Sequence, residues 1–329
     1  MKQGKEFGEE VLRLDPERET GRICARIREL MLTRVKRRGV VVGLSGGIDS
    51  SVTAALAVRA LGRDRVVALE MPERHSAQET LTLSGMVAAS LGIETAVEDI
   101  SGILEAVGFY RKYDEAVRMV VPGYGEGWKS KIVISNNIDH PGFTLFYVVA
   151  QDAQSATSTV RLPFKPYLEI VAATNFKQRI RKMLEYYHAD RLNFAVAGTP
   201  NRLEYDQGFF VKLGDGAADI KPIAHLYKSQ VYQLAEYLGI PEEVRKRRPT
   251  TDTYSLSQGQ DEFYFSLPYE QMDLCLFARN NGIPAESVAC VVGLNPEQVR
   301  SVFRDIDVKR STTRYLHLPP LLVDDIAWD

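Results

Sequence analysis

The chain has 329 residues, and its 41 Lys plus Arg nearly balance its 43 Asp plus Glu, giving a formal net charge of −2. A charge so close to zero argues against non-specific electrostatic binding of nucleic acid. Hydrophobic residues make up 45% of the chain, which is ordinary for a globular protein with an ample core. We see no apolar run near the roughly 20 residues that a membrane-spanning helix needs. Neither a membrane nor a nucleic acid is therefore expected as a partner.

The N-terminus and the cysteines bear on the cellular compartment. The first 20 residues are charged and lack the apolar segment of a signal peptide. Cys24, Cys275 and Cys290 are odd in number, far apart and without the spacing of a disulfide framework or a zinc site. These observations predict a cytoplasmic protein with reduced thiols.

The first hundred residues alternate between helical and strand patterns. We predict helices at 9–35, 50–62 and 77–92, and β segments at 39–44, 65–72 and 93–100. The segment GVVVGL at 39–44 has the continuous apolar pattern of a buried parallel strand. Strands that alternate with helices are typical of a doubly wound parallel α/β sheet.

The alternation is interrupted between residues 107 and 170. This segment contains the turn-rich stretch VVPGYGEGW and a predicted β-hairpin around Asn136 to Gly142, so we interpret it as an insertion or flap. The α/β pattern then resumes with a helix at 175–188, a strand at 192–198 and a helix at 228–238. Several short helices follow at 269–310. We expect one domain over residues 1–329, with residues 269–329 as a helical C-terminal extension.

The segment between the first strand and its helix, SGGIDSS, is rich in groups that bind phosphate. A glycine-rich turn at a helix N-terminus presents backbone N–H groups to an anion, and the helix dipole adds to the attraction. Serine hydroxyls can donate to phosphate oxygens, and an aspartate can hold Mg²⁺ against them. Neither G-x-x-x-x-G-K-[ST] nor G-x-G-x-x-G is present, so two common phosphate motifs are excluded.

SGGIDSS resembles the PP-loop of the N-type ATP pyrophosphatases, a family that releases pyrophosphate from ATP while adenylating a substrate. The second half narrows the resemblance. It contains, in order, NFKQRIR, GTPNRLE, GFFVKLGDG, PIAHLYK and LGIP. This succession resembles ammonia-dependent NAD synthase and, with the PP-loop segment, extends the resemblance over roughly residues 20–105 and 172–275. The resemblance implies a PP-loop sheet of the adenine nucleotide alpha hydrolase type, a homodimer, and ATP, Mg²⁺, deamido-NAD and ammonia as reactants or cofactors.

The resemblance also implies roles for individual residues. Mg²⁺ would be held by Asp49 and Glu204, and Asp49, Lys228 and Thr199 would be catalytic. ATP would be bound by the PP-loop and three later residues: Ser45, Gly46, Gly47, Asp49, Ser50, Ser51, Thr199, Lys228 and Thr250. Deamido-NAD would face Asn175, Arg179 and Asp215.

These residue types suit the implied chemistry. A carboxylate that attacks the α-phosphorus of ATP builds negative charge on both products, which a lysine and Mg²⁺ can neutralise. Ammonia then displaces AMP, so no side-chain nucleophile is needed, and no Ser-His-Asp or H-E-x-x-H pattern is found. These 329 residues leave no room for a glutaminase domain beside the motifs, so we expect free ammonia or a separate donor protein to supply the nitrogen.

The helix at 175–188 has two predicted faces. Phe176, Ile180, Met183 and Tyr187 recur at helical spacing and are expected in the core. The basic residues of this helix would form a solvated face if no family were considered, and the resemblance favours a functional role for Arg179 alone, with Lys177, Arg181 and Lys182 left open.

The sequence departs from the family pattern at the end that would bind the acyl substrate. Asp261 and Glu262 are present, but Tyr264 stands where a further acid is expected, and Val308 precedes Lys309 and Arg310 where a histidine is common. A ligase that amidates a different carboxylate therefore remains an alternative. Weaker alternatives are a tRNA-modifying enzyme, an inactive nucleotide sensor, and a DNA-binding regulator with a helix-turn-helix at 283–310, whose second helix carries mixed charge.

Overall fold

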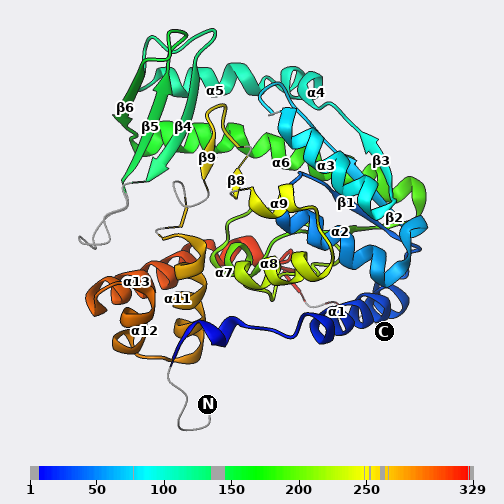
Figure 1. Ribbon diagram of the computed structural model, residues 1–329. Helices are drawn as coiled ribbons and strands as arrows, with labels where there is room; N and C mark the ends of the chain where they lie inside the picture. Colours follow the sequence, from blue (N-terminus) through cyan, green and yellow to red (C-terminus); the bar gives the residue numbers. More distant parts are fainter. Residues whose placement is uncertain are drawn as a thin grey trace.

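The structure is a computed structural model that describes residues 7–76, 78–134, 145–247, 249–251, 253–259, 264–265, 267–324 and 326. A parallel sheet lies between helices on both faces, an antiparallel sheet lies at one end of the molecule, and a group of helices lies below it (Figure 1). None of the described helices combines the length and apolarity that a bilayer span requires.

The parallel sheet is built around β1 (Val40–Gly43), and its strand order is β3-β2-β1-β7. The other strands are β2 (Val66–Glu70), β3 (Glu94–Val97) and β7 (Ala195–Ala197), and each neighbouring pair is parallel. Val40 and Val42 are buried on one face of the sheet and Val41 on the other. Because the chain places β2 and β3 on one side of β1 and β7 on the other, the predicted doubly wound sheet is confirmed.

Helices cover each face of this sheet. The first face packs against α1 (Pro16–Leu30), α2 (Ile48–Leu61), α3 (Gln78–Leu91) and α8 (Lys228–Tyr237). The second packs against α4 (Ser101–Ala106), α5 (Phe109–Arg118) and α6 (Phe164–Leu192). The nearly wholly apolar composition of α2 is explained by this position, because α2 lies between the sheet and other helices.

The predicted helix at 9–35 is divided. A 3₁₀ turn covers Glu9–Leu12, α1 starts at Pro16, and a π turn follows at Met31–Val35. Asp15 caps α1 by accepting the N–H of Arg18 at 3.0 Å. Proline lacks an N–H and has a fixed φ, so it fits the first turn of a helix. A helix that precedes it in the chain cannot continue through it, which explains why the predicted helix is interrupted before Pro16.

The segment 107–170 contains more regular structure than expected. Strands β4 (Lys129–Ile134) and β5 (Phe146–Gln151) form the predicted hairpin, and its turn lies outside the described residues. A third antiparallel strand, β6 (Thr157–Arg161), follows. Helices α4 and α5 were not predicted, and α6 begins at Phe164 rather than at 175. Ile132 and Val148 share a buried cluster with α5 and α6, so this sheet is anchored to the second face.

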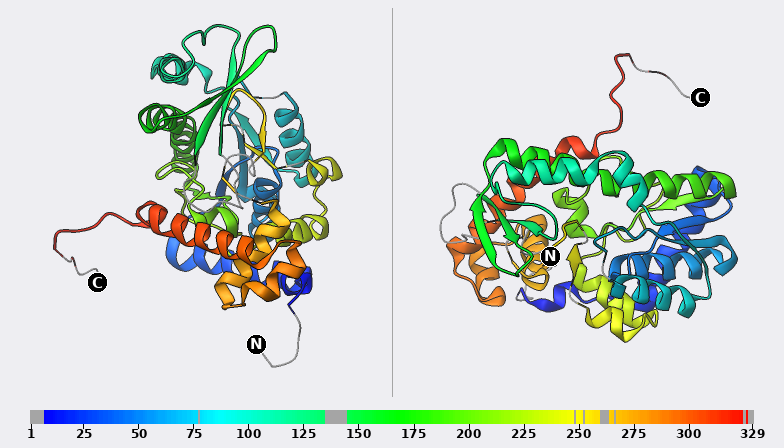
Figure 2. Two further views of the ribbon diagram at one scale, coloured as in Figure 1. Left: turned by 90° about the vertical axis from the view of Figure 1, so that its left-hand side faces the viewer. Right: turned by 90° about the horizontal axis from the view of Figure 1, so that it is seen from above.

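The C-terminal part is helical, as expected. Its cluster of buried residues joins α11 (Tyr269–Asn281), α12 (Ala285–Val292) and α13 (Pro296–Thr313), and includes Leu12 from the N-terminal turn. Shorter elements lead into it: α7 (Arg202–Gln207), α9 (Glu242–Lys246), and β8 (Thr250–Thr251) paired with β9 (Gln258–Gly259). After a 3₁₀ turn at Arg314–His317, the chain runs away from the body of the molecule (Figure 2), with Leu321 and Val323 exposed.

Candidate active site

A cleft of about 1350 Å³ opens at the carboxyl ends of the parallel strands. Its walls come from the loop after β1, the residues after β2 and β7, one side of α6, the loop at 208–215 and α13. Ligands of open α/β sheets bind at the point where the strand order reverses, because adjacent loops diverge there. In this sheet that point is between β1 and β7, so the sequence motifs at 45–51 and 199–204 meet in the cleft.

The loop after β1 is arranged as an anion site. Gly47 precedes α2, and in the described structure no side chain caps that end of the helix. Ser50 donates to the carbonyl of Gly47 at 3.0 Å and accepts the N–H of Ser45 at 3.3 Å, which closes the loop on itself. The uncapped first turn of α2 therefore points its amides and its positive dipole end at the cleft.

Gly46 is required by its conformation and by its neighbour. Its φ is +66°, and a Cβ atom added there would lie 2.7 Å from the carbonyl oxygen of Thr80 in α3. The loop can approach α3 only because this position has no side chain. Gly46 therefore shapes the loop, while the cleft itself is lined by Ser45, Gly47, Asp49 and Ser50.

Two further predicted ATP contacts are Ser51 and Thr250. The Ser51 side chain is fully buried and donates to the Gly47 carbonyl at 2.8 Å, so its hydroxyl supports the first turn of α2. Thr250 lies in β8, where it pairs with Gly259, and its side chain lies outside what the structure describes. Ser51 is not among the described residues that line the cleft, and the role predicted for Thr250 stays a prediction.

Asp49 and Lys228 form a buried ion pair in the cleft. The Lys228 ammonium donates to Oδ2 of Asp49, and the Asn201 amide donates to Oδ1 at 3.1 Å. Lys228 is only 2% exposed. Burial by itself lowers the pKa of Lys228, but the carboxylates of Asp49 and Glu204 outweigh it and raise the pKa. The lysine is thus a fixed positive charge beside the phosphate loop.

The position of Lys228 is set by the start of α8. The backbone N–H groups of Lys228 and Ser229 donate to Asp273 at 3.2 and 2.7 Å. Burial raises the pKa of Asp273 to about 7, although these hydrogen bonds act in the opposite direction. Asp273 therefore ties α11 to the N-terminus of α8 and fixes the direction in which Lys228 enters the cleft.

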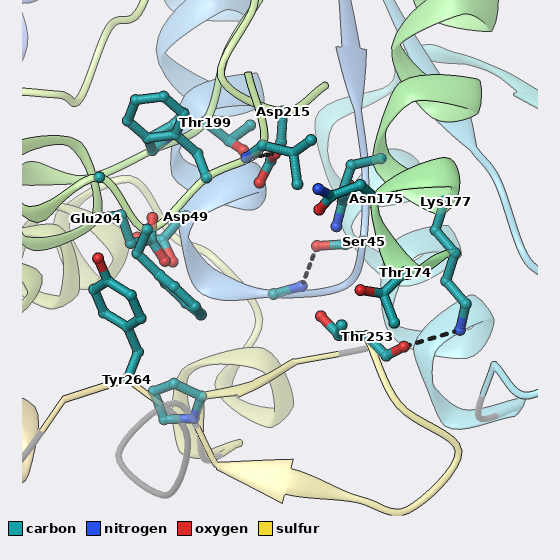
Figure 3. Close-up of a pocket in the computed structure, with 18 of the residues that line it drawn as sticks. Ser45, Asp49, Thr174, Asn175, Lys177, Thr199, Glu204, Asp215, Thr253 and Tyr264 are labelled. Atoms are coloured by element: carbon teal, nitrogen blue, oxygen red, sulfur yellow. Dashed lines mark hydrogen bonds between the residues drawn. The ribbon is translucent and has the colours of Figure 1, made fainter. Parts of the chain in front are cut away.

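Glu204 and Thr199 reach the cleft from the segment after β7. Asn201 and Glu204 cap α7 reciprocally, with Asn201 Oδ1 accepting the Glu204 N–H at 3.2 Å and Glu204 Oε2 accepting the Asn201 N–H at 3.1 Å. Figure 3 shows the carboxylates of Asp49 and Glu204 side by side in the cleft, with Thr199 nearby. Within the described residues there is no cluster of three or more metal-ligating side chains. A cation held here would therefore take two protein carboxylates and complete its shell from phosphate or water, which suits Mg²⁺.

The residues predicted to face the second substrate also line this cleft. Asn175 and Arg179 lie on α6, and the Arg179 Nε donates to the carbonyl of Lys212 at 3.3 Å. Asp215 accepts the N–H of Val211 at 2.7 Å, and burial raises its pKa. Figure 3 places Asn175 beside Ser45 and across the cleft from Asp49 and Glu204.

The predicted faces of α6 are correct only in part, because Phe176 and Ile180 pack in the core whereas other positions are exchanged. Lys177 and Lys182 are 2% and 6% exposed, whereas Met183 and Tyr187 are 55% and 60% exposed. Ile180 is buried as expected. The exchange has a physical cause, since the buried lysines are neutralised by buried carboxylates and so do not need solvent. Lys182 pairs with Glu185 at 2.6 Å, three residues along the same helix.

Glu73, the carboxylate that pairs with the buried Lys177, was not predicted from the sequence. Lys177 Nζ lies 2.7 Å from Oε1 of Glu73 and donates to the carbonyl of Thr253 at 3.1 Å (Figure 3). Tyr110 donates to the other oxygen of Glu73 at 3.1 Å. Glu73 and Lys177 are 104 residues apart, and no local pattern links them. This group joins the end of β2, α5, α6 and the segment that follows β8 behind one wall of the cleft.

Comparison with known proteins places this cleft in a family. The profile of the NAD synthase family matches residues 19–123 and 146–313. The chain belongs to the NAD synthase family. It is 58% identical to the NH(3)-dependent NAD(+) synthetase of Mesorhizobium japonicum over 97% of this chain and 100% of that relative. A second relative of the same name, from Rhizobium meliloti, is 58% identical over 97% of this chain and 96% of the relative.

Solved structures show the same fold at lower identity. NMN synthetase from Francisella tularensis gives a TM-score of 0.65 at 22% identity and covers 95% of this chain and 100% of that one. NH3-dependent NAD synthetase from Campylobacter jejuni gives 0.61 at 24%, and covers 94% and 100%. The predicted family, fold class and ligase activity are confirmed. The alternative of a DNA-binding regulator fails, and the mixed charges of α13 are paired locally, with Arg300 on Glu286 and Glu297.

The departures from the NAD synthase pattern have structural consequences at one wall of the cleft. Tyr264 donates to the carbonyl of Gln207 at 2.6 Å and stacks on Phe209 with ring centroids 4.6 Å apart. Lys309 donates to the carbonyl of Tyr264 at 2.6 Å and to Asp305 at 2.7 Å. An aromatic pair held by α13 therefore stands where an acid was expected, and Asp261 and Glu262 lie outside the described residues.

Proposed function

We propose that this cleft joins ammonia to the carboxylate of deamido-NAD in an ATP-dependent reaction that yields NAD, AMP and pyrophosphate. The observation that carries the proposal is the buried Lys228–Asp49 pair beside an uncapped, glycine-rich phosphate loop. The family assignment supports it, because relatives that match the chain end to end at 58% identity bear the name NH(3)-dependent NAD(+) synthetase. The same identity makes deamido-NAD the preferred acyl substrate over another carboxylate.

The chemistry proceeds in two displacements. A carboxylate oxygen of deamido-NAD attacks the α-phosphorus of ATP, the bond to the β-phosphate oxygen breaks, and pyrophosphate leaves. The nitrogen of ammonia then attacks the acyl carbon, AMP departs with the bridging oxygen, and the nitrogen loses a proton. Lys228, the loop amides and the hydroxyls of Ser45 and Ser50 stabilise the charge that collects on pyrophosphate. No enzyme-bound acyl group is formed on a side chain.

Magnesium fits the donor set described above. Asp49 and Glu204 would hold it, with the remaining ligands from phosphate oxygens and water. When bound, Mg²⁺ neutralises phosphate charge and polarises the phosphorus under attack. Lys228 orients Asp49 by donating a hydrogen bond to its Oδ2.

Asn175, Arg179 and Asp215 would contact the acyl substrate. An arginine suits the phosphates of a dinucleotide, because its planar guanidinium donates two parallel hydrogen bonds to them. Thr199 lines the same cleft as Ser45 and Ser50, where its hydroxyl can donate to the reacting phosphate.

A homodimer is the assembly that the exposed surface of α6 favours. Met183 and Tyr187 lie one turn apart and are more than half exposed. Val308 and Tyr315, 59% and 60% exposed, add apolar surface on and after α13. Large apolar side chains exposed on a helix in this way are typical of protein interfaces. Replacing Met183 and Tyr187 together by Glu should give a monomer in sedimentation velocity, and an unchanged sedimentation coefficient would exclude this surface. The reduced cysteines agree with a cytoplasmic location.

The activity is tested by pyrophosphate release from ATP with Mg²⁺ and ammonium, with and without deamido-NAD, and by separate measurement of NAD. Asp49→Ala should abolish both signals. Asp64→Ala is the matched control, because the Asp64 side chain is 96% exposed next to Arg63 and away from the cleft. If deamido-NAD elicits neither pyrophosphate nor NAD from the wild-type protein, the proposal is wrong.

A further inference from the structure

The antiparallel sheet in the segment 107–170 supports one wall of the cleft. Thr253 and Tyr254, which follow β8, are among the residues that line the cleft. The chain then continues along β4, and Figure 1 shows β9 next to that strand. Because β4 is an edge strand of its sheet, the backbone groups on its second side can bond to another stretch of chain.

Hydrogen bonds tie residues 255–258 to this edge of β4. The backbone N–H of Ser130 donates to the Ser255 hydroxyl at 2.9 Å, and the N–H of Leu256 donates to the Ser130 carbonyl at 3.2 Å. The amide of Gln258 donates to the carbonyl of Ile132. Ser130 and Gln258 are each 1% exposed, so these bonds are shielded from water, which strengthens them.

The same wall is held from its other end by α6. Lys177 donates to the carbonyl of Thr253 (Figure 3). Tyr254 is buried in the cluster that also contains side chains of α5 and α6. The cleft wall at residues 253–254 is therefore fixed on one side by α6 and on the other by β4.

Strand β4 lies outside the pattern that defines the family. The NAD synthase profile matches residues 19–123 and 146–313, and β4 falls in the gap between these two stretches. The residues that bond to β4, at 255–258, lie in the second matched stretch. The tie to β4 is therefore an addition to a part of the chain that the family shares.

We propose that Ser255 and Gln258 are positioning residues, which hold the wall at residues 253–254 against β4 so that water stays out of the cleft while the acyl-adenylate is present. This inference rests on the proposed function, since the acyl-adenylate is its intermediate. When water enters, its oxygen attacks the acyl carbon, the bond to the AMP oxygen breaks, and the attacking water loses its protons. Deamido-NAD is regenerated, and ATP has been converted to AMP and pyrophosphate without formation of NAD.

The test measures pyrophosphate released per NAD formed, with saturating ATP and deamido-NAD and with ammonium near its KM, where water competes best. Gln258→Met keeps the length of the side chain and removes the bond to Ile132. The ratio should rise roughly twofold to fivefold above the wild type, as expected when one hydrogen bond that holds a segment is lost. Ser255→Ala should raise it in the same way, and Ser255→Thr, which keeps the hydroxyl, should match the wild type.

Gln271→Met is the matched control. Gln271 makes the same kind of bond, from its amide to the carbonyl of Val292 at 2.9 Å, but this bond ties α11 to α12, and Gln271 is not among the described residues that line the cleft. The control should lose a similar amount of stability in urea unfolding and keep the wild-type ratio of pyrophosphate to NAD.

Three outcomes decide the question. A Gln258→Met protein with the wild-type ratio would overturn the inference, and so would an equal rise in Gln271→Met, because a general loss of stability would then be the cause. If Gln258→Met does not fold, the comparison of Ser255→Ala with Ser255→Thr decides by the same ratio. A wild-type protein that yields neither pyrophosphate nor NAD with deamido-NAD refutes the proposed function instead, and this result is distinct from a changed ratio.

Discussion

Replacing Lys228 by methionine should remove most activity while leaving a folded protein. Methionine retains the length of the lysine stem and therefore its packing between α8 and the cleft. The backbone N–H of residue 228 would still donate to Asp273, so the start of α8 should persist. What is lost is the single buried ammonium next to Asp49.

The expected magnitudes follow from that position. Removing one preorganised donor to a developing oxyanion typically lowers kcat by about 10²–10³-fold. Breaking a buried ion pair costs about 3–5 kcal/mol when the remaining charge is fully enclosed. The Asp49 side chain is 16% exposed at the cleft and keeps the hydrogen bond from Asn201, so we expect roughly 2–3 kcal/mol of lost unfolding free energy.

Pyrophosphate release measures the first effect and urea unfolding the second. Lys246→Met is a suitable control, because Lys246 is 76% exposed and forms an ordinary surface pair with Glu242. A Lys228→Met protein that unfolds cooperatively and keeps kcat within about threefold of the wild type would refute the role of Lys228 as the charge that stabilises pyrophosphate.

Three further changes test other parts of the structure. Gly46→Ala should weaken ATP binding at least tenfold in calorimetry and lower the unfolding free energy by about 1–2 kcal/mol. The control Gly21→Ala lies in α1 with nothing within 4 Å of the added Cβ, so it should be neutral or stabilising. Equal effects of the two changes would contradict the requirement for glycine at position 46. Lys177→Met should destabilise by about 3 kcal/mol by stranding Glu73. In the wild type, burial acts to raise the pKa of Glu73, but Lys177 more than offsets this and lowers it. The pair therefore stabilises the protein above pH 4.5, and that stability is lost as the pH falls through the lowered folded-state pKa. Chemical unfolding from pH 3 to 7 should show that this loss of stability in acid vanishes in the variant, and its persistence would exclude the pair as the cause. Asp273 has a raised pKa of about 7, so its contribution to stability is present below pH 3.8 and declines as the pH rises towards 7. Asp273→Asn should flatten that decline, and an unchanged profile would show that Asp273 does not titrate there.

Much of the sheet and the phosphate end of the site follows from local sequence. The valine-rich segment before SGGIDSS predicts a buried parallel strand, and strand order alone then brings Thr199 and Glu204 beside Asp49. Family motifs identified Lys228 and Asp215, which the structure places in the same cleft.

The parts that were missed depend on contacts between distant residues. The faces of α6 were predicted only in part, because Met183 and Tyr187 follow the apolar helical pattern and are nevertheless exposed. Lys177 can be buried only because Glu73 meets it from the end of β2. The early start of α6 depends on its packing against α5, and strand β6 depends on its pairing with β5, which no local period reveals. A pattern of polarity reports which residues share a helical face and cannot say which face is covered.

The size of the cleft has a kinetic consequence. About 1350 Å³ of continuous space exceeds the roughly 300–1000 Å³ of an ordinary small-molecule site. Two large substrates can therefore reside together, and an acyl-adenylate can form and react without either half leaving. Such an enzyme follows a sequential rate law, in which reciprocal plots at different concentrations of the second substrate intersect, in contrast to the parallel lines of ping-pong catalysis. The reactive anhydride is then never released to water.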